Sequence, residues 1–226
     1  MLAAQFVIII IIHAWIHTIG VDAGRRKRMK RISVMLATLL VAAFTLVGCV
    51  SAPTSEAGWT TVFDGTHLNN FTRLGDANWR LVDGLVQADL GGKDASYLVS
   101  KQSYDDFQMR AEFWVDSDAN SGIFIRVQNP AKIGADSSYE VNVFDKRPDP
   151  SYGTGGIPNV APTLVPLKAG GQWNVYEITA KGPQLTIVLN GIKTVDVRDT
   201  KYAKGPYALQ YGGGVVKFRK VQIRPI

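Results

Sequence analysis

Cysteine is almost absent from this 226-residue sequence, in which Cys49 is the only one. A single cysteine excludes a disulfide framework and a metal site built from cysteine thiolates. Histidine is scarce too, and only His67 of the three follows residue 48, in a segment typical of a surface turn. The sequence therefore also excludes a histidine-rich metal site beyond residue 48.

Several short catalytic motifs are missing. The sequence contains no Gly-x-Ser-x-Gly, no phosphate-binding loop and no dinucleotide fingerprint. It also lacks a Glu-x-Asp-x-x-Glu strand, which argues against a retaining glycosidase of the laminarinase type. Asp116–Asn120 begins like a calcium loop, but Ser121 and Val127 stand where an EF-hand needs glycine and glutamate. A Ca²⁺ ion bound by carboxylates elsewhere stays open as a cofactor.

The residues before Cys49 indicate targeting. Met29-Lys30-Arg31 opens a short basic stretch, an uncharged apolar run covers Val34–Val47, and Leu46-Val47-Gly48-Cys49 has the form of a lipobox. This pattern predicts a lipoprotein signal peptide over residues 29–48 and a diacylglycerol on the Cys49 thiol. The alternative is a transmembrane helix with an incidental cysteine, although the run is shorter than the ~20 residues that a span needs.

Further segments flank this signal. An apolar run, Phe6–Trp15, precedes the basic cluster Arg25–Arg28. Because Met29 begins a complete signal peptide, residues 1–28 are interpreted as an over-extended start, with an uncleaved N-terminal helix as the alternative. Residues 49–57 are mostly small and polar and predict a lipidated tether. We expect the chain to be held at the membrane of a bacterial cell envelope, on its periplasmic or outer-surface side.

The positive charge is concentrated at the N-terminus. The chain has 25 Lys+Arg and 19 Asp+Glu, a net charge of +6. Residues 1–48 contain six of the basic and one of the acidic residues, which leaves +1 for residues 49–226. The basic excess therefore belongs to the targeting segment and does not support nucleic acid as a partner.

From Gly58 onward, short runs of aromatic and β-branched residues alternate with polar ones, and no helix of useful length is predicted. The clearest strand is Phe107–Val115, with Gln108, Arg110 and Glu112 on its polar face. The other predicted strands are Trp79–Val82, Leu85–Asp89, Tyr97–Ser100, Ser121–Gln128, Tyr139–Phe144, Trp173–Ala180, Leu185–Leu189, Ile192–Val197, Tyr207–Tyr211 and Val215–Arg224.

Turn residues connect these strands. Asp83-Gly84 and Asn190-Gly191 supply the positive φ values that two-residue hairpin turns need. Asp145–Gly171 is rich in proline and glycine, is too long for a hairpin, and is predicted to be a functional loop at the rim. About ten strands without helices predict an all-β fold of two antiparallel sheets, a sandwich or jelly roll.

Two predicted strands carry charged and amide groups among apolar residues. Residues of one parity share a face, so Arg126 is expected beside Gln128, and Glu140 beside Asn142. If the strands pair, a guanidinium and a carboxylate could meet on one face, where they could orient a sugar hydroxyl or keep a catalytic carboxylate ionised. A structural salt bridge on a wet sheet face is the alternative.

The order of short motifs resembles a known family. Trp59–Gly65, with Leu68 and Phe71 after it, is similar to the opening "FDG…L…W" signature of the 3-keto-disaccharide hydrolase domain family. Further matches follow in the family's order, namely Asp106-Phe107, Asn120–Arg126, Tyr139-Glu140-Val141 with Asp145, Trp173-Asn174, Leu189-Asn190-Gly191 and Leu209-Gln210. The resemblance covers residues 58–226, which we expect to form one domain.

The resemblance implies a concanavalin-like jelly roll that cleaves glycosidic bonds in sugars oxidised at C3, such as 3-keto-disaccharides or 3-keto-glucosides. Glu140 is then the base or a metal-coordinating carboxylate, and Arg126 stabilises developing oxyanion charge. Asn142 and Gln210 are the amides that orient sugar hydroxyls. Asp145, at odd spacing from Glu140, joins them only through a bulge or the long loop.

The remaining predicted substrate-binding residues are Asn120, Gln128, Tyr211, Trp114 and Tyr152. Trp114 has the polar parity of its strand and Tyr152 lies in the long loop, so both are candidates to stack on sugar rings. Tyr211 stands where family members often have a histidine, which favours the alternative of a non-catalytic, lectin-like envelope module. The expected partners are a carbohydrate and, through Cys49, a membrane.

Overall fold

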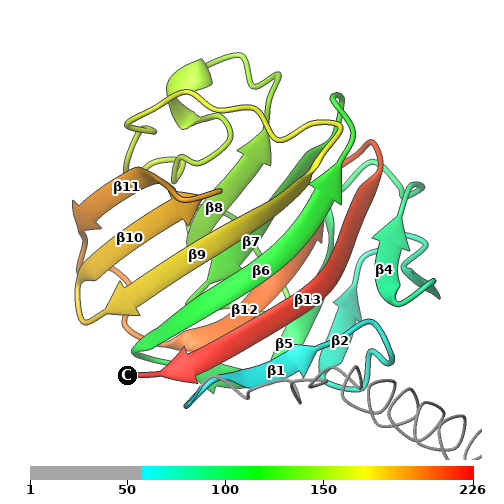
Figure 1. Cartoon of the computed structure of the whole chain (residues 1–226), viewed down its shortest axis with the longest axis horizontal. Coiled ribbons are helices and arrows are strands. Elements are labelled where there is room, and N and C mark those ends of the chain that lie inside the picture. Colours follow the sequence, from blue (N-terminus) through cyan, green and yellow to red (C-terminus); the bar gives the residue numbers. More distant parts are fainter. Residues whose placement is uncertain (1–56) are drawn as a thin grey trace, which may run out of the picture. The chain divides into compact units, whose positions relative to one another are not determined.

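The structure, a computed structural model, describes residues 57–226 (Figure 1). The predictions for Cys49, for the signal peptide over residues 29–48 and for the division at residue 28 lie outside the described residues. Within residues 57–226 no helix is long and apolar enough to cross a membrane.

Two antiparallel sheets stack face to face, which confirms the predicted all-β sandwich (Figure 1). The larger sheet has eight strands in the order β11 (Ile192–Arg198), β10 (Gln184–Leu189), β9 (Trp173–Lys181), β6 (Phe107–Val115), β13 (Val216–Pro225), β4 (Leu85–Ala88) and β3 (Arg80–Val82), with β1 (Thr60–Phe63) also paired to β13. The smaller sheet has five strands in the order β2 (Phe71–Leu74), β5 (Ser96–Tyr104), β12 (Gly205–Tyr211), β7 (Asn120–Ile125) and β8 (Tyr139–Phe144).

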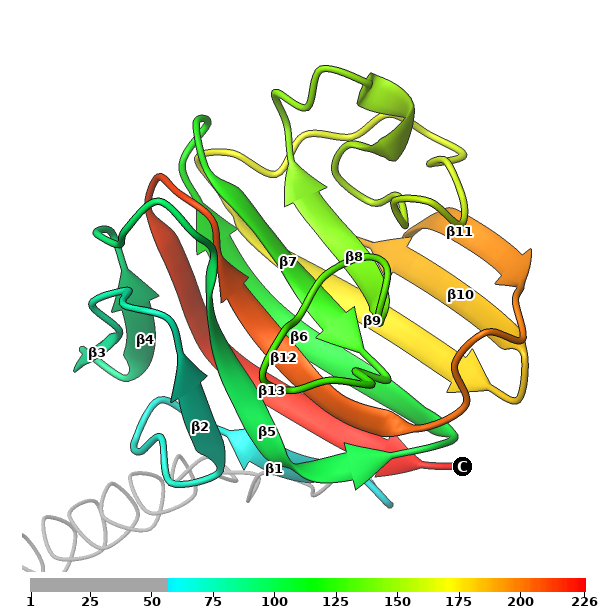
Figure 2. The same cartoon turned by 180° about the vertical axis from the view of Figure 1, so that it is seen from behind.

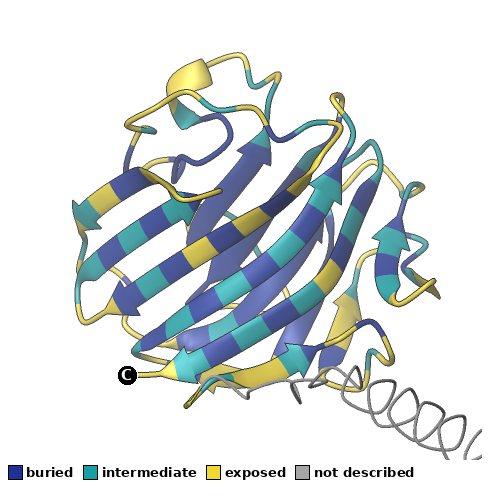
Figure 3. Cartoon of the chain, viewed as in Figure 1, coloured by how far each residue is buried: buried dark blue, intermediate teal, exposed yellow. Residues whose placement is uncertain are grey.

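The core lies between the sheets and follows from the period-two alternation of the strands. In β6, Phe107, Met109, Ala111, Phe113 and Val115 are buried, while the residues between them are half-buried (Figure 3). Burying one such large side chain contributes about 1.5–3 kcal/mol relative to leaving it in water. The same alternation leaves one outward face on each sheet, and these two outer faces carry the polar chemistry.

The two predicted hairpins are present. β3 and β4 are joined by Asp83 and Gly84 with φ of 50° and 75°, and β10 and β11 by Asn190 and Gly191 with φ of 51° and 81°. Two successive positive φ values match the right-handed twist of the flanking strands, which is why Asp-Gly and Asn-Gly stand there.

The prediction was wrong at the end of β7 and omitted two strands. β7 ends at Ile125 instead of Gln128, because Arg126 has a φ of 53° and turns the chain out of the sheet. β1 and β2 each have four residues, of which only one is buried, so neither shows a clear alternation in the sequence.

The predicted loop Asp145–Gly171 runs along the free edge of β8 (Figure 2). Its only regular element is the short 3-10 helix η1 (Pro150–Tyr152). The backbone amide of Gly155 donates to the Asn142 carbonyl at 3.0 Å, and the Asn142 amide donates to the Gly156 carbonyl at 3.0 Å. The loop thereby pairs with an edge strand that would otherwise present open hydrogen-bonding groups.

Candidate active site

The outer face of the smaller sheet brings together a carboxyl group and two amides. Gly122 lies in β7, between β12 and β8, and its register partner in β8 is Asn142. A β-carbon at Gly122 would lie 3.3 Å from Glu140 Oε1 and 3.3 Å from Gln210 Oε1. These distances are shorter than a β-carbon normally tolerates, so a glycine here lets the two groups come close together over the strand. We call the five residues Tyr97, Gly122, Glu140, Asn142 and Gln210 the acid–amide site.

Two loops and an apolar cluster reduce the contact of this face with water. Tyr97, Phe124 and Ala208 are buried on the outer side of the smaller sheet, and Ile133 packs against their cluster from the segment that joins β7 to β8. The rings of Tyr97 and Phe124 meet edge to face at a centroid distance of 5.3 Å. Figure 2 shows the β7–β8 connection crossing this sheet from one end, with the long loop at the other.

This cover changes the titration of Glu140. Its side chain is buried, and burial raises the pKa of the carboxyl to about 7, although the positive charge of Arg147 acts in the opposite direction. Desolvation disfavours the charged form, so near neutral pH the protonated and ionised forms are both populated. A carboxyl group in that state can accept a proton and return it within one reaction.

Tyr97 completes the site from β5, where its register partner is Gln210 in β12. Burial raises the pKa of the Tyr97 hydroxyl, the nearby Glu140 carboxylate raises it further, and a hydrogen bond with the Gln210 side chain opposes both. The hydroxyl therefore stays protonated at neutral pH. It donates to the Ile133 carbonyl at 3.5 Å, a long bond that a substrate oxygen can replace.

Two buried amide oxygens in the site have no hydrogen-bond partner among residues 57–226. They are Asn142 Oδ1 and Gln210 Oε1. The orientation of Asn142 is fixed because its Nδ2 donates to the Tyr152 carbonyl at 2.7 Å, which leaves the oxygen as the open end. A buried acceptor without a partner costs about 1–3 kcal/mol, which a hydroxyl group of a ligand can remove.

The prediction that Arg126 meets Glu140 was wrong, although their strands pair as expected. The Arg126 guanidinium is buried and donates to the carbonyls of Asp105, Gly182 and Tyr202 and to the Asp106 carboxylate, at 2.8–3.0 Å. The positive φ of Arg126 points its side chain toward these loops. Arg126 therefore fastens three connections at one end of the sandwich.

Gln128 and Asp145 are occupied by structural bonds as well. Gln128 lies beyond the end of β7, where its Nε2 donates to two backbone carbonyls at 2.8 Å. Asp145 follows β8, and its carboxylate accepts from the Thr154 hydroxyl at 2.6 Å and from the Ala169 and Gly170 amides at 2.9–3.0 Å. Asp145 thus ties together the two ends of the long loop and lies outside the acid–amide site.

The aromatic candidates are dispersed. Tyr211 points into the core, where its ring meets Trp79 edge to face at 6.3 Å. Trp114 lies on the outer face of the larger sheet, on the opposite side of the sandwich. Asn120 begins β7 on the same side as Gly122 and therefore borders the site. Tyr152 lies in η1, and its link to the site is its backbone carbonyl, which accepts from Asn142 Nδ2.

The sequence arguments missed Tyr97, Gly122 and Arg147. A glycine inside a β-branched and aromatic strand is a local signal that could have identified Gly122. No local signal identifies Tyr97, because its place depends on the pairing of β5 with a strand more than a hundred residues away. Residues 57–226 contain no group of three or more His, Cys, Asp or Glu side chains that could hold a metal ion, so the suggested Ca²⁺ ion has no carboxylate cluster in this part of the chain.

The fold and this site define a jelly-roll domain with a buried acid and amides on one sheet face. A family model for the 3-keto-alpha-glucoside-1,2-lyase-like domain matches residues 58–224, and the chain belongs to that family. The resemblance inferred from the ordered motifs is thereby confirmed, and with it a carbohydrate-related function.

Solved structures share the fold at low sequence identity. A candidate glycosyl hydrolase from Parabacteroides distasonis has a TM-score of 0.65 and 18% identity, with 75% of this chain and 94% of that chain covered. A carbohydrate-binding module, CBM66 from Bacillus subtilis, has a TM-score of 0.53 and 18% identity over 74% of this chain and 95% of that one. A prokaryotic β-1,3-1,4-glucanase from a mouse hindgut metagenome has a TM-score of 0.52 and 10% identity, with 74% of this chain and 99% of that chain covered. No curated protein matches the chain.

Proposed function

We propose that the acid–amide site cleaves glycosidic bonds in sugars oxidised at C3, either 3-keto-disaccharides or 3-keto-glucosides. The observation that carries this proposal is the buried Glu140 carboxyl, with a pKa of about 7, beside two unpaired amide oxygens. Family membership supports the substrate class.

The reaction needs one base that can also act as an acid. A ketone at C3 acidifies the proton on C2, which the Glu140 carboxylate takes up. The electron pair of the C2–H bond moves onto the C3 carbonyl as an enolate. It then returns to form a C1–C2 double bond while the bond from C1 to the glycosidic oxygen breaks with its electrons on that oxygen. Protonated Glu140 can then deliver its proton to the leaving oxygen, and water adds across the double bond. A pKa of about 7 suits both transfers at neutral pH.

The other residues of the site bind and polarise the substrate in this proposal. Gln210 Oε1 and Asn142 Oδ1 accept hydrogen bonds from sugar hydroxyls, since both are unpaired acceptors. The Tyr97 hydroxyl donates to the C3 oxygen as negative charge develops there, a role earlier assigned to Arg126. The positive charge of Arg147 stabilises the ionised form of Glu140.

We also propose that the domain works from the cell envelope. The lipobox ending at Cys49 and the polar residues 50–57 support a lipid anchor followed by a short tether. Such an anchor would keep the site on the periplasmic or outer-surface side of a membrane, where glycosides arrive from outside.

A non-catalytic carbohydrate-binding domain is the second candidate. Two desolvated amide acceptors can bind a glycan without any proton transfer, and a solved carbohydrate-binding module shares the fold. The two candidates differ in whether Glu140 takes a proton from the ligand.

The experiment that separates them supplies the purified chain with a 3-keto-glucoside and, in parallel, with the unoxidised glucoside. The proposal predicts that the aglycone is released from the 3-keto compound alone. NMR measures this release. Binding of the 3-keto compound without release would support the second candidate and contradict the first.

A further inference from the structure

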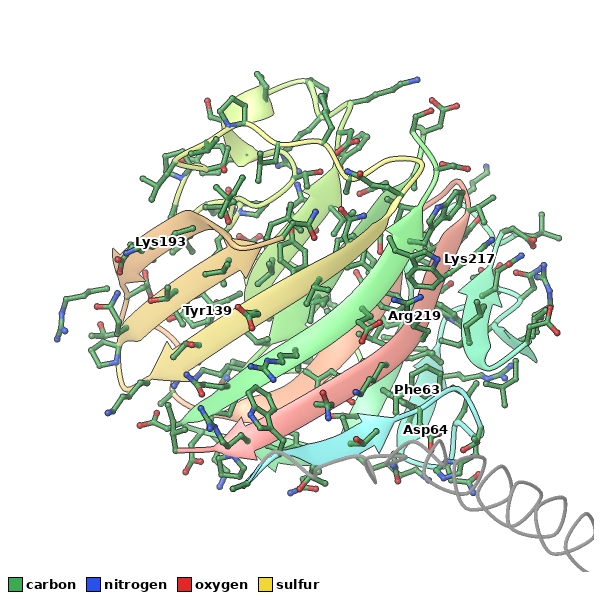
Figure 4. The ribbon with its side chains drawn as sticks, in the orientation of Figure 1. Phe63, Asp64, Tyr139, Lys193, Lys217 and Arg219 are labelled. Atoms are coloured by element: carbon green, nitrogen blue, oxygen red, sulfur yellow. The ribbon has the colours of Figure 1, made fainter. Side chains whose placement is uncertain are left out.

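The outer face of the larger sheet, opposite the acid–amide site, carries three tryptophans, each covered by a cation. Figure 4 labels two of these cations, Lys217 and Arg219, on this face. Lys217 Nζ lies 4.5 Å from the Trp114 ring centre, and the guanidinium carbon of Arg219 lies 4.2 Å from that of Trp173. The guanidinium carbons of Arg110 and Arg224 lie 4.5 Å and 5.0 Å from the centre of the Trp59 ring. We define the tryptophan–cation face as Trp59, Trp114, Trp173, Arg110, Lys217, Arg219, Lys220 and Arg224.

This face is continuous across three neighbouring strands. Lys217 in β13 is paired with Trp114 in β6, which is paired with Trp173 in β9, so they form one row. Trp173 is 37% exposed to solvent, and Val175 in the same strand is exposed to the same extent. Aromatic rings with an apolar body and a polar edge are typical of the boundary between water and lipid.

The charge of the face is positive. Its five cations are opposed by Glu112, which accepts from Arg219, and by Glu177, which accepts from Arg110 at 3.1 Å. Within residues 57–226, neither Lys217 nor Lys220 forms an ion pair. Lys220 and Arg219 also line a shallow depression together with Thr61, Glu112 and Asp64, and Asp64 adds a third carboxylate against the five cations. These cations can therefore bind further negative charge from outside the domain.

The chain enters the domain at this face. Trp59 is the third described residue, and its contacts with Arg110 and Arg224 place it on the outer side of the larger sheet. The predicted tether of residues 49–57 spans at most about 30 Å when fully extended. If Cys49 carries a lipid, the membrane surface is therefore within reach of this face.

We infer that the tryptophan–cation face rests on an anionic phospholipid surface, with its indole rings at the level of the headgroups and its lysines and arginines on the phosphates. The acid–amide site, on the other outer face of the sandwich, then points away from the membrane toward solution. This inference does not depend on the chemistry proposed for Glu140.

The test uses the purified chain reconstituted into vesicles of phosphatidylcholine alone or with 30% phosphatidylglycerol (~0.3 mole fraction, enough for a negative surface potential). Oxidative footprinting read by mass spectrometry reports the exposure of Trp173 and Trp114 separately, with Tyr152 as an internal reference. We expect both tryptophans to be oxidised several-fold more slowly on the anionic vesicles, and the protection to vanish at about 1 M salt, where screening is strong.

A pair of double variants isolates the charge. Lys217→Gln with Lys220→Gln should lower the ratio of docked to undocked domain about 30-fold, since each cation near an anionic surface contributes about fivefold. The matched control is Lys93→Gln with Lys101→Gln, which removes the same charge from exposed lysines outside the larger sheet. The control should keep the protection.

Three results would overturn the inference. Equal oxidation on neutral and anionic vesicles would show that the face does not dock. Protection in detergent that grows with protein concentration would assign the face to a second copy of the chain. Protection by a soluble oligosaccharide without vesicles would assign it to glycan.

Discussion

The two outer faces of the sandwich come from the same alternation of strand residues but differ in how far their polar groups are removed from water. On the smaller sheet, Glu140, Asn142 and Gln210 are buried beneath loops, and two amide oxygens lack partners among residues 57–226. On the larger sheet, Glu112 and Glu177 are paired with arginines at the surface. Burial raises the pKa of Glu140 to about 7, so the cover over a strand determines which carboxylate can act as a base.

The largest effect is expected from Glu140→Gln. It removes the proposed base without changing the shape of the side chain, so turnover of a 3-keto-glucoside should fall by about 10²–10⁴-fold. The measurement is the initial rate by NMR. Glu112→Gln is the matched control on the other face and should leave the rate unchanged in detergent, whereas an equal loss in both variants would contradict the assignment.

Replacement of Arg126 separates structural from catalytic roles. Arg126→Met leaves the three carbonyls without their guanidinium donor and the Asp106 carboxylate with only the Gly182 amide, and should lower the free energy of unfolding by about 3–5 kcal/mol. Turnover per folded molecule should stay within about threefold, since no reacting group is lost. Denaturant titration gives the stability. If the variant had normal stability but no turnover, Arg126 would have a catalytic role instead of a structural one.

The pH dependence of stability tests the burial of Glu140. Its pKa is about 7 in the folded protein against an ordinary value of 4.5, so between these values the folded state holds a proton that the unfolded state has lost. The free energy of unfolding should therefore fall as the pH rises through this window, by on the order of 3 kcal/mol in all. Glu140→Gln should lack this decline and be more stable than the wild type at pH ~8. If the free energy of unfolding changed with pH in the same way in both proteins, the raised pKa of Glu140 would be contradicted.

The smallest effect is expected on the tryptophan–cation face. Lys217→Gln removes only a cation above a half-exposed ring, so the free energy of unfolding should change by less than about 1 kcal/mol. Turnover in detergent should be unaffected. A loss of several kcal/mol, measured by thermal unfolding, would mean that this face stabilises the fold instead of being available to a partner.

Much of the fold could be predicted because its signals are local. The alternation in β6 and the Asp-Gly and Asn-Gly turns each depend on a few neighbouring residues. The two-residue spacing of Glu140 and Asn142 in one strand also predicted that they share a face of the sheet. Arg126 could not be predicted, since one positive φ after Ile125 redirects its side chain to loops distant in sequence. Tyr97 was missed because only the β5–β12 register brings it beside Gln210.

The most direct test of the central claim compares a 3-keto-glucoside with the same compound carrying deuterium at C2. If Glu140 removes the C2 proton in the rate-limiting step, the deuterated substrate should react more slowly, and the rates of both compounds should rise as Glu140 ionises around pH 7. Equal rates for the two compounds, with no exchange of the C2 position with solvent, would contradict proton abstraction and with it the function proposed for the acid–amide site.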